Sequence, residues 1–357
     1  MAEDSSRMDF GKTLKMLAPG TIFRLGIENV LQANTGGLIV VGDTPEVMQL
    51  TSGGFKVDCA FTPARLYELA KMDGAIITNH DVSRILYANA QLDPDPALPT
   101  QETGIRHRTA ERVALQTGEL VVAISQRRRM VTLYKGSSSY RMRDIASTLI
   151  KANQALQTLE KYRNVLSREL QRLGGLEFEE LVTLGEVCEL LRRSIRVLNI
   201  GGEIEIYISE LGVEGRLVRM QLIELIANVY EEATLIIKDY YNARDKSPAE
   251  VLNAMLRDFE EENCDLIYLA RILGLGTASS HLEQQVSPRG YRMLHKIPRI
   301  PPAIIDNLVQ EFALLHNITR ASIEQLDDVE GIGEVRARSI KNGLMRLREQ
   351  LLLDYMV

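Results

Sequence analysis

The sequence predicts a multidomain protein that joins an amino-terminal α/β domain to two all-α parts. Three observations carry this prediction: a length of 357 residues, an alternation of short apolar runs with amphipathic segments up to residue 140, and a helical periodicity beyond it. Domains commonly have about 100–200 residues, so a chain of this length suits two or three of them. We place the domains at residues 1–140, 141–288 and 289–357.

The first domain is expected to contain a central mixed sheet covered by helices. Apolar runs typical of buried strands occur at residues 38–41, 75–78, 120–124 and 130–134. Residues 63–70 and 109–116 have the spacing of helices, and this alternation indicates an α/β fold. The proline-rich stretch 92–104 cannot form a regular element, and so long a loop within a domain is more often functional than not.

The second part, residues 141–288, is predicted to be a helical spine. Apolar residues recur at spacings of three and four between Ile145 and Leu173. This pattern favours a helix packed in a bundle over the alternative of a free-standing coiled coil. Ser247-Pro-Ala-Glu250 has the pattern of a capping box and predicts a helix start. The Gly-Gly pairs at 174–175 and 201–202 are expected to interrupt helices.

The third part, residues 289–357, has the pattern of a helix-hairpin-helix. A short helical segment at 323–326 is followed by Gly331 and Gly333 and then by a second helix. The glycines permit a tight turn whose backbone amides face a DNA phosphate, and the alternative is a protein-binding module on the same scaffold. DNA is favoured because basic residues follow the turn, and the candidate contacts are Gly331, Gly333, Arg336, Arg338 and Lys341. Residues 297–301 have the spacing of a second, degenerate hairpin with prolines in place of glycines.

The composition is that of an ordinary globular protein, with an uneven distribution of charge. Asp and Glu number 48 against 42 for Lys and Arg, a net charge of −6, yet basic residues concentrate at 106–112, at 127–143 and in the last hairpin. Three widely spaced cysteines exclude a disulfide framework and fit a reducing cytoplasm. The chain shows neither a signal peptide nor an apolar run of membrane-spanning length. The absence of Trp argues against stacking on single-stranded bases and for contacts through phosphates.

Asp73-Gly74-Ala75 lies immediately before a predicted strand. An Asp-Gly turn is common at such a place, and the motif alone favours that structural interpretation. The functional alternative is that Asp73 meets a metal ion or a sugar hydroxyl. A residue without a side chain beside it would let a nucleotide approach the backbone.

Arg106-His107-Arg108 comes directly before Thr109, where a helix is predicted to begin. The amides and the positive dipole at a helix N-terminus suit phosphate, and two guanidinium groups add strong bidentate contacts. A solvated basic turn is the alternative. Three adjacent cationic or titratable groups favour a polyphosphate site.

Ser125-Gln-Arg-Arg-Arg129 forms a basic turn between two predicted strands. Its arginines either neutralise a triphosphate or only protect an exposed sheet edge, and the sequence favours neither. The chain contains no Walker phosphate loop, no dinucleotide fingerprint and no H-E-x-x-H zinc motif. A nucleotide in the first domain must therefore bind by another route.

Four motifs together resemble the family of DNA-integrity scanning diadenylate cyclases: DGA at 73–75, LDPDP at 92–96, RHRTAER at 106–112 and AIS at 123–125. With the helical spine and the terminal hairpin, the resemblance covers essentially the whole chain. Members of that family condense two ATP molecules into cyclic di-AMP and two pyrophosphates with Mg²⁺ or Mn²⁺. They recognise branched DNA such as Holliday junctions and form octamers. The resemblance thus implies a cytoplasmic, nucleoid-associated enzyme of DNA-damage checking.

The resemblance also implies roles for individual residues. Asp73 is expected to bind the metal or to activate the 3′-hydroxyl, and Arg106, His107 and Arg108 are expected to act on the phosphates. The implied ATP-binding set is Gly74, Ala75, Leu92, Ile105, Arg106, His107, Arg108, Thr109 and Ser125. Ile105 departs from the family pattern, in which Thr is expected. A side-chain hydroxyl contact is therefore missing there, while a backbone contact remains possible.

The resulting hypothesis is a DNA-responsive diadenylate cyclase. Making a ring requires two reciprocal transfers, so two identical domains are expected to face each other across a two-fold axis, and a monomer should bind ATP yet be inactive. The alternative is a non-catalytic DNA-junction scaffold whose first domain only senses nucleotide. A nuclease is disfavoured because no paired-carboxylate cluster is evident.

Overall fold

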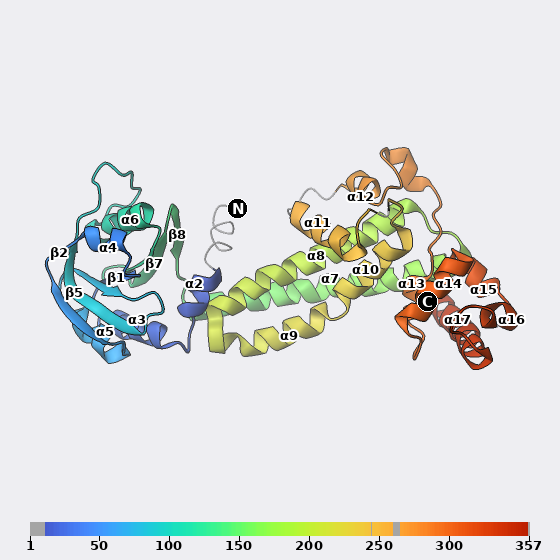
Figure 1. Cartoon of the computed structure of the whole chain (residues 1–357), viewed down its shortest axis with the longest axis horizontal. Helices are drawn as coiled ribbons and strands as arrows, with labels where there is room; N and C mark the ends of the chain where they lie inside the picture. The colour runs from blue at the N-terminus through green and yellow to red at the C-terminus, as the bar shows by residue number, and fades with distance from the viewer. Residues whose placement is uncertain (1–10, 244, 260–264, 356–357) are drawn as a thin grey trace. The chain divides into compact units, whose positions relative to one another are not determined.

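The structure, a computed structural model, describes residues 11–243, 245–259 and 265–355 (Figure 1). The chain divides into two compact units, Met1–Gln154 with Ile204–Met220 and Ala155–Glu203 with Gln221–Val357. The three predicted domain ranges divide the chain differently, and their boundaries stay a prediction. Within the described residues, no helix has both the length and the apolar character needed to cross a membrane.

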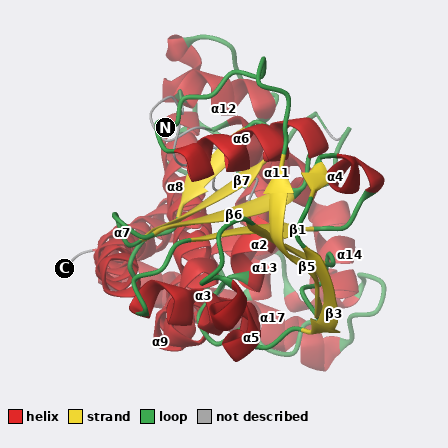
Figure 2. Cartoon of the chain, turned by 90° about the vertical axis from the view of Figure 1, so that its left-hand side faces the viewer, coloured by secondary structure: helices red, strands yellow, loops and turns green. Residues whose placement is uncertain are grey.

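The first unit is built on a central mixed sheet, as predicted (Figure 2). The sheet has eight described strands. The strands follow the order β2-β5-β4-β1-β6-β7-β8, and β3 also pairs with β5. Their bounds are β1 Gly37–Val41, β2 Thr51–Ser52, β3 Phe55–Ala60, β4 Ala75–Thr78, β5 Arg84–Leu92, β6 Leu120–Ser125, β7 Met130–Lys135 and β8 Ser138–Arg141. β1 and β4 run parallel, and the other described pairs are antiparallel. The four predicted strands correspond to β1, β4, β6 and β7.

Helices cover both faces of this sheet (Figure 2). Side chains alternate along a strand, so Ile39 packs on one face with α3 (Ile22–Gln32) and α5 (Pro63–Leu69). Val40, one residue on, packs on the other face against Ala110 of α6 (Ile105–Thr117). The other described helices before the spine are α2 Gly11–Met16 and α4 Pro45–Gln49. This three-layer arrangement holds the N-terminus of α6 against the strand ends that form the site.

Long helices follow the sheet: α7 Ile145–Glu179, α8 Leu184–Leu211 and, after a short 3-10 turn at Gly212–Gly215, α9 Arg216–Ile226. The expectation that the Gly-Gly pairs interrupt helices is wrong, because α7 and α8 continue through them. A Cβ at Gly174 would lie 2.8 Å from a methyl carbon of Leu351, and one at Gly201 would lie 3.2 Å from a methyl carbon of Ile226. These glycines serve close packing. The predicted capping box of Ser247 and Glu250 is confirmed.

The second unit also contains α10 Val229–Tyr240, α11 Pro248–Asp258 and α12 Leu266–Ile272, followed by a 3-10 turn at Ser279–Glu283. It ends in a helical module with its own apolar core, whose described helices are α13 Tyr291–His295, α14 Pro302–Phe312, α15 Leu315–Arg320, α16 Ile323–Asp327 and α17 Glu334–Tyr355. Leu294, Leu308 and Ile340 are fully or almost fully buried in that core. Ala337 is also buried there, as expected of a small residue that permits close helix packing.

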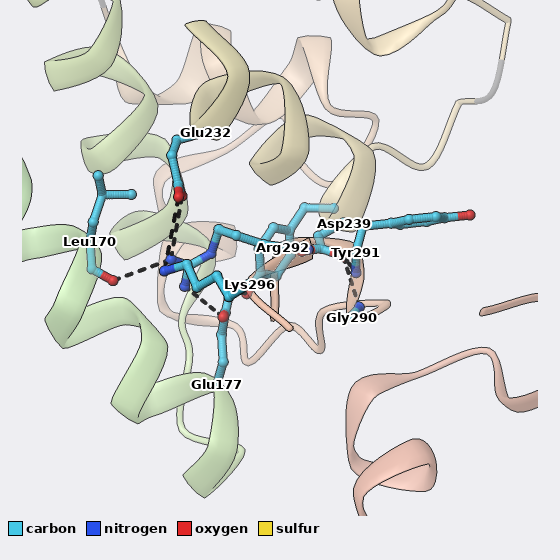
Figure 3. Close-up of polar contacts among 9 residues, drawn as sticks. Leu170, Glu177, Glu232, Asp239, Gly290, Tyr291, Arg292 and Lys296 are labelled. Atoms are coloured by element: carbon cyan, nitrogen blue, oxygen red, sulfur yellow. Dashed lines mark hydrogen bonds and ion pairs between the residues drawn. The ribbon is translucent and has the colours of Figure 1, made fainter. Parts of the chain in front are cut away.

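A buried ionic cluster joins α13 of this module to the long helix α7 (Figure 3). The guanidinium of Arg292 donates to the carboxylate of Glu177 over 2.6 Å, and neither side chain is exposed. A second Arg292 nitrogen donates to the carbonyl of Leu170 over 3.3 Å. Asp239 of α10 accepts hydrogen bonds from the backbone amides of residues 290, 291 and 292, which begin α13. The start of the module is thereby fixed to the spine by buried charge.

Candidate active site

An open cleft of about 1470 Å³ lies where β4 begins and where β5 and β6 end. It is larger than a typical enclosed ligand pocket of about 300–1,000 Å³, so it suits a large ligand with access from outside. The predicted site residues that line it are Asp73, Gly74, Ala75, Leu92, Ile105, Arg106, His107, Thr109 and Ser125. Residues of the DGA, RHRTAER and AIS motifs, which are distant in sequence, therefore lie on one surface together with Leu92 at the end of β5.

Gly74 sits in the turn before β4 with φ +95°, a conformation that other residues rarely adopt. A Cβ there would lie 2.9 Å from the carbonyl oxygen of Ala90 on β5. The glycine is thus required for the turn to approach β5, and this places Asp73 at the edge of the cleft. The exposed Asp73 carboxylate makes no hydrogen bond or ion pair with another described residue, so it is available to a ligand.

Helix α6 begins at Ile105 and not at Thr109, so the predicted helix start was four residues late. Gly104 is its N-cap and supplies no side-chain hydrogen bond. The first backbone bond of the helix runs from the amide of Arg108 to the carbonyl of Gly104 over 2.9 Å. The amides before Arg108 have no partner within the helix, and they belong to cleft-lining residues. This end of α6 suits an anionic group of a ligand.

The three residues of the basic triplet point in different directions, because helix positions are spaced about 100° apart around the axis. Arg106 and His107 are half-buried and line the cleft, whereas Arg108 is exposed and does not. The Arg106 guanidinium lies 3.5 Å from the carbonyl oxygen of Ile124. It passes so close to Gly36 that a Cβ there would lie 2.1 Å from it. The positive charges of the cleft are completed by Arg127 and Arg128 of the basic turn.

The second half of the RHRTAER motif holds the proline-rich loop. Arg112 Nε donates to the carbonyl of Leu98 over 2.9 Å, and Glu111 accepts from the hydroxyl of Thr100. One turn further along α6, Gln116 accepts from the backbone amide of Asp95 over 3.0 Å. These residues fasten residues 93–104 over α6, which makes that loop a wall of the cleft.

A hydrogen-bonded chain that the sequence did not reveal stands behind His107. His107 Nδ1 lies 2.9 Å from the hydroxyl of Tyr134, which donates to Glu102 over 3.0 Å. Burial lowers the pKa of His107; Glu102 opposes this shift, while the neighbouring arginines add to it. Burial, with Glu102 beside it, raises the pKa of the Tyr134 phenol. The sequence contained one signal for this chain of hydrogen bonds: Tyr134 ends the apolar run of a predicted strand, and a buried phenol requires a polar partner.

A cation at this cleft would have to be held in part by the ligand. In the described part of the chain, no three His, Cys, Asp or Glu side chains group closely enough to bind a metal by themselves. Mg²⁺ is commonly bound by one or two carboxylates together with substrate phosphates and water. The free Asp73 carboxylate, on a cleft that also presents cationic side chains suited to phosphate, fits that mode of binding.

The terminal hairpin forms a second candidate site. Gly331 has φ +81°, and Arg299 has φ +67° at the corresponding position of the degenerate hairpin, so each turn has a left-handed residue at the same place. Arg336 donates to the carbonyl of Gly331 over 2.6 Å, and Arg338 pairs with Glu334 on the exposed side of α17. Lys341 differs from the other candidates, since its ammonium donates to the carbonyl oxygens of residues 319 and 321 at 2.7 and 2.6 Å.

Family models match most of the chain. Residues 24–139 match the model described as DisA bacterial checkpoint controller nucleotide-binding, and residues 142–282 match the DisA bacterial checkpoint controller linker region. Residues 314–342 match the helix-hairpin-helix motif. The nucleotide-binding model therefore covers every residue of the cleft described above.

Relatives of high identity span nearly the full length. A protein named DNA integrity scanning protein DisA from Symbiobacterium thermophilum is 56% identical over 349 residues, covering 98% of each chain. Proteins of the same name from Carboxydothermus hydrogenoformans and Bacillus subtilis are 58% and 52% identical. These matches cover 94% and 97% of this chain, and 96% of each relative.

Proposed function

The chain belongs to the DNA integrity scanning protein DisA family and is a diadenylate cyclase with a helix-hairpin-helix DNA-binding module; from this premise we propose that it condenses two ATP molecules into cyclic di-AMP and two pyrophosphates. One observation carries the proposal. The free carboxylate of Asp73, the amide-bearing end of α6 and the Arg106 guanidinium all lie on one cleft.

The proposed reaction needs a proton acceptor and positive charge near the phosphates. The 3′-oxygen of one ATP attacks the α-phosphorus of the other, and the bond to pyrophosphate breaks. Asp73 either accepts the hydroxyl proton or holds Mg²⁺ or Mn²⁺, which when bound would lower the pKa of the hydroxyl and offset phosphate charge. Arg106, Arg127 and Arg128 stabilise the charge that develops on the departing pyrophosphate. The amides of α6 hold a phosphate group throughout.

Ring closure requires the same transfer twice, so two clefts must meet. We propose that two copies of the chain face each other across a two-fold axis, each holding one ATP, within a larger assembly such as an octamer. The open form of the cleft supports this, because a second nucleotide must enter from outside. Apolar side chains exposed on the first unit offer surface for self-association: Ile22, Leu25, Leu217 and Met220.

The direct test of the cyclase is incubation of the purified chain with ATP and Mn²⁺ or Mg²⁺, followed by chromatography of the products. Cyclic di-AMP is expected, and Asp73→Asn should abolish it while leaving the fold intact, since the exposed Asp73 makes no described contact. Wild-type rates in Asp73→Asn, or no cyclic dinucleotide at all, would favour the alternative of a nucleotide-sensing scaffold.

We further propose that the terminal hairpin binds branched double-stranded DNA such as a Holliday junction through phosphates, and that this binding modulates the cyclase. Contacts from the backbone amides of Gly331 and Gly333 are independent of base sequence, so affinity should fall steeply with salt. Arg336 and Arg338 add exposed positive charge at the start of α17.

The hairpin offers a matched pair of variants for this claim. Proline already occupies position 301, which corresponds to Gly333, and both residues come directly before a helix. Gly333→Pro should therefore keep the turn while removing one amide donor. Gly333→Ala is the control, since a Cβ there meets no atom within 4 Å. Weaker junction binding in the proline variant alone is expected, and equal affinity of both variants would contradict an amide contact at Gly333.

A further inference from the structure

The chain of hydrogen bonds behind His107 determines which ring nitrogen carries the proton. Three groups from different elements take part: Glu102 from the loop, His107 from the first turn of α6, and Tyr134 from β7. Tyr134 is 1% exposed, and the Glu102 side chain is 17% exposed. Their partners are therefore fixed by packing.

The direction of the protons follows from counting donors. An ionised carboxylate only accepts, so the single proton of the Tyr134 hydroxyl must be donated to Glu102. The phenol oxygen then presents only lone pairs to His107 Nδ1, 2.9 Å away. His107 Nδ1 must consequently carry a proton. In the neutral imidazole, which burial favours, Nε2 then carries the lone pair.

The other ring nitrogen is left for a ligand. His107 lines the cleft, and its Nε2 makes no hydrogen bond to another described residue. A neutral Nε2 accepts hydrogen bonds and cannot donate one. It therefore does not suit a phosphate oxygen, which also only accepts, and it does suit a hydroxyl or an amine of a nucleoside.

We propose that Glu102 and Tyr134 are positioning residues that hold His107 in its Nδ1–H form, so that Nε2 accepts a hydrogen bond from a donor on the nucleoside part of the substrate. This inference rests on the proposed function, since it takes ATP as the ligand of the cleft. It gives the residues of the basic triplet different roles. Arg106 meets phosphate charge, whereas His107 selects the nucleoside.

Binding of unreactive nucleotides to the full-length protein tests the proposal by calorimetry. The probe is α,β-methylene-ATP, whose bridging carbon prevents release of pyrophosphate, and inorganic tripolyphosphate is the comparison. Tyr134→Phe and Glu102→Gln should each weaken the nucleotide by about three- to tenfold, the effect of one lost neutral hydrogen bond, and should leave tripolyphosphate unchanged. Analogues of the probe without the 3′-hydroxyl or without the 6-amino group identify the donor, because the loss disappears with the analogue that lacks it.

Tyr140 supplies the matched control for a buried phenol. It is also almost fully buried in the first unit and donates to a carboxylate, that of Glu210, but it does not line the cleft. Tyr140→Phe should leave nucleotide affinity unchanged. Glu102→Gln remains informative if Tyr134→Phe fails to fold, because Glu102 lies on a loop.

The pH profile separates this role from a purely structural one. Nucleotide affinity should fall as the pH drops through the pKa of His107, since a protonated Nε2 cannot accept. Glu102 raises that pKa, whereas Arg106, Arg128 and Arg141 lower it, so Glu102→Gln should move the acidic limb to lower pH. Equal losses for nucleotide and tripolyphosphate, no loss in either variant, or an unmoved acidic limb would each overturn the inference. If the wild-type chain binds no nucleotide and makes no cyclic di-AMP, the proposed function itself fails.

Discussion

Removal of the Arg292 guanidinium should destabilise the second unit strongly, because it leaves a buried carboxylate without its cation (Figure 3). Arg292 and Glu177 are both fully buried and are 2.6 Å apart. Of the described hydrogen-bond partners of Glu177, Arg292→Met leaves only the hydroxyl of Tyr240, at 2.9 Å. Breaking a buried pair from one side costs about 3–5 kcal/mol, so we expect a loss of that size in the free energy of unfolding.

A second substitution should restore much of this loss. Glu177→Gln on the Arg292→Met background removes the uncompensated charge, and the amide oxygen still accepts from Tyr240. Replacing both partners of a buried pair is often nearly neutral, so the double variant should be more stable than Arg292→Met alone. Arg320→Met is the matched control, because its ion pair with Glu180 is largely exposed and is worth about 1 kcal/mol or less.

The assay must be local, since a chain of two compact units need not unfold in one step. Hydrogen exchange followed by mass spectrometry reports the opening free energy of peptides that contain α13, and urea unfolding followed by circular dichroism reports the helical unit as a whole. Faster exchange at α13 in Arg292→Met, with recovery in the double variant, is expected. The reasoning is refuted if Arg292→Met costs no more than Arg320→Met, or if Glu177→Gln adds a further loss in place of recovery.

Three further predictions concern single residues. Burial and the neighbouring Glu177 raise the pKa of Asp239 to about 7, so the folded protein holds a proton that the unfolded chain releases above about pH 4. The free energy of unfolding of the second unit should therefore fall as the pH rises from 5 to about 8 in urea titrations, and Asp239→Asn should flatten that slope. Gly74→Ala should abolish cyclic di-AMP formation and lower the melting temperature, because a left-handed non-glycine residue costs about 1–2 kcal/mol and its Cβ would displace Ala90 of β5. Lys341→Met should reduce stability, because the ammonium of Lys341 donates to the carbonyl of Thr319, and it should leave the salt dependence of DNA binding unchanged. If Lys341 contacted a DNA phosphate, its loss would lower the slope of log affinity against log salt concentration by about one.

The parts of the sheet that the sequence predicted are those buried on both faces. β1, β4 and β6 are continuous apolar runs, since helices cover them on either side. β3 and β5 escaped prediction for the opposite reason. β3 is mostly exposed, and β5 alternates irregularly around Asn89, which has φ +53° next to shifts in strand register. A bulged strand loses the period of two on which sequence patterns depend.

The sequence predicted those residues of the candidate site whose chemical type is needed for function and is not needed to form the fold. The RHR motif pointed to the cleft because three consecutive cationic or titratable residues are uncommon in a plain turn. The DGA motif alone favoured a structural turn, and it pointed to the cleft only in combination with RHRTAER. Arg112 and Lys341 show the limit of such reasoning. Each is a cation beside a predicted binding motif, yet each donates to backbone carbonyls of its own unit. An unpaired backbone carbonyl and a phosphate oxygen both accept hydrogen bonds from a cationic side chain. A basic motif alone therefore cannot distinguish a residue that holds a loop from one that binds a ligand.

The same limit explains why Glu102 and Tyr134 were missed although His107 was found. A histidine next to arginines indicates a phosphate site by charge, but its proton position depends on what lies behind the ring. That partner comes from β7, 27 residues along the chain, and from a loop without a motif. Only the fold brings a carboxylate, a phenol and an imidazole into contact. These contacts are the reason for our proposal that His107, which the sequence assigns to phosphate, accepts a hydrogen bond from the nucleoside.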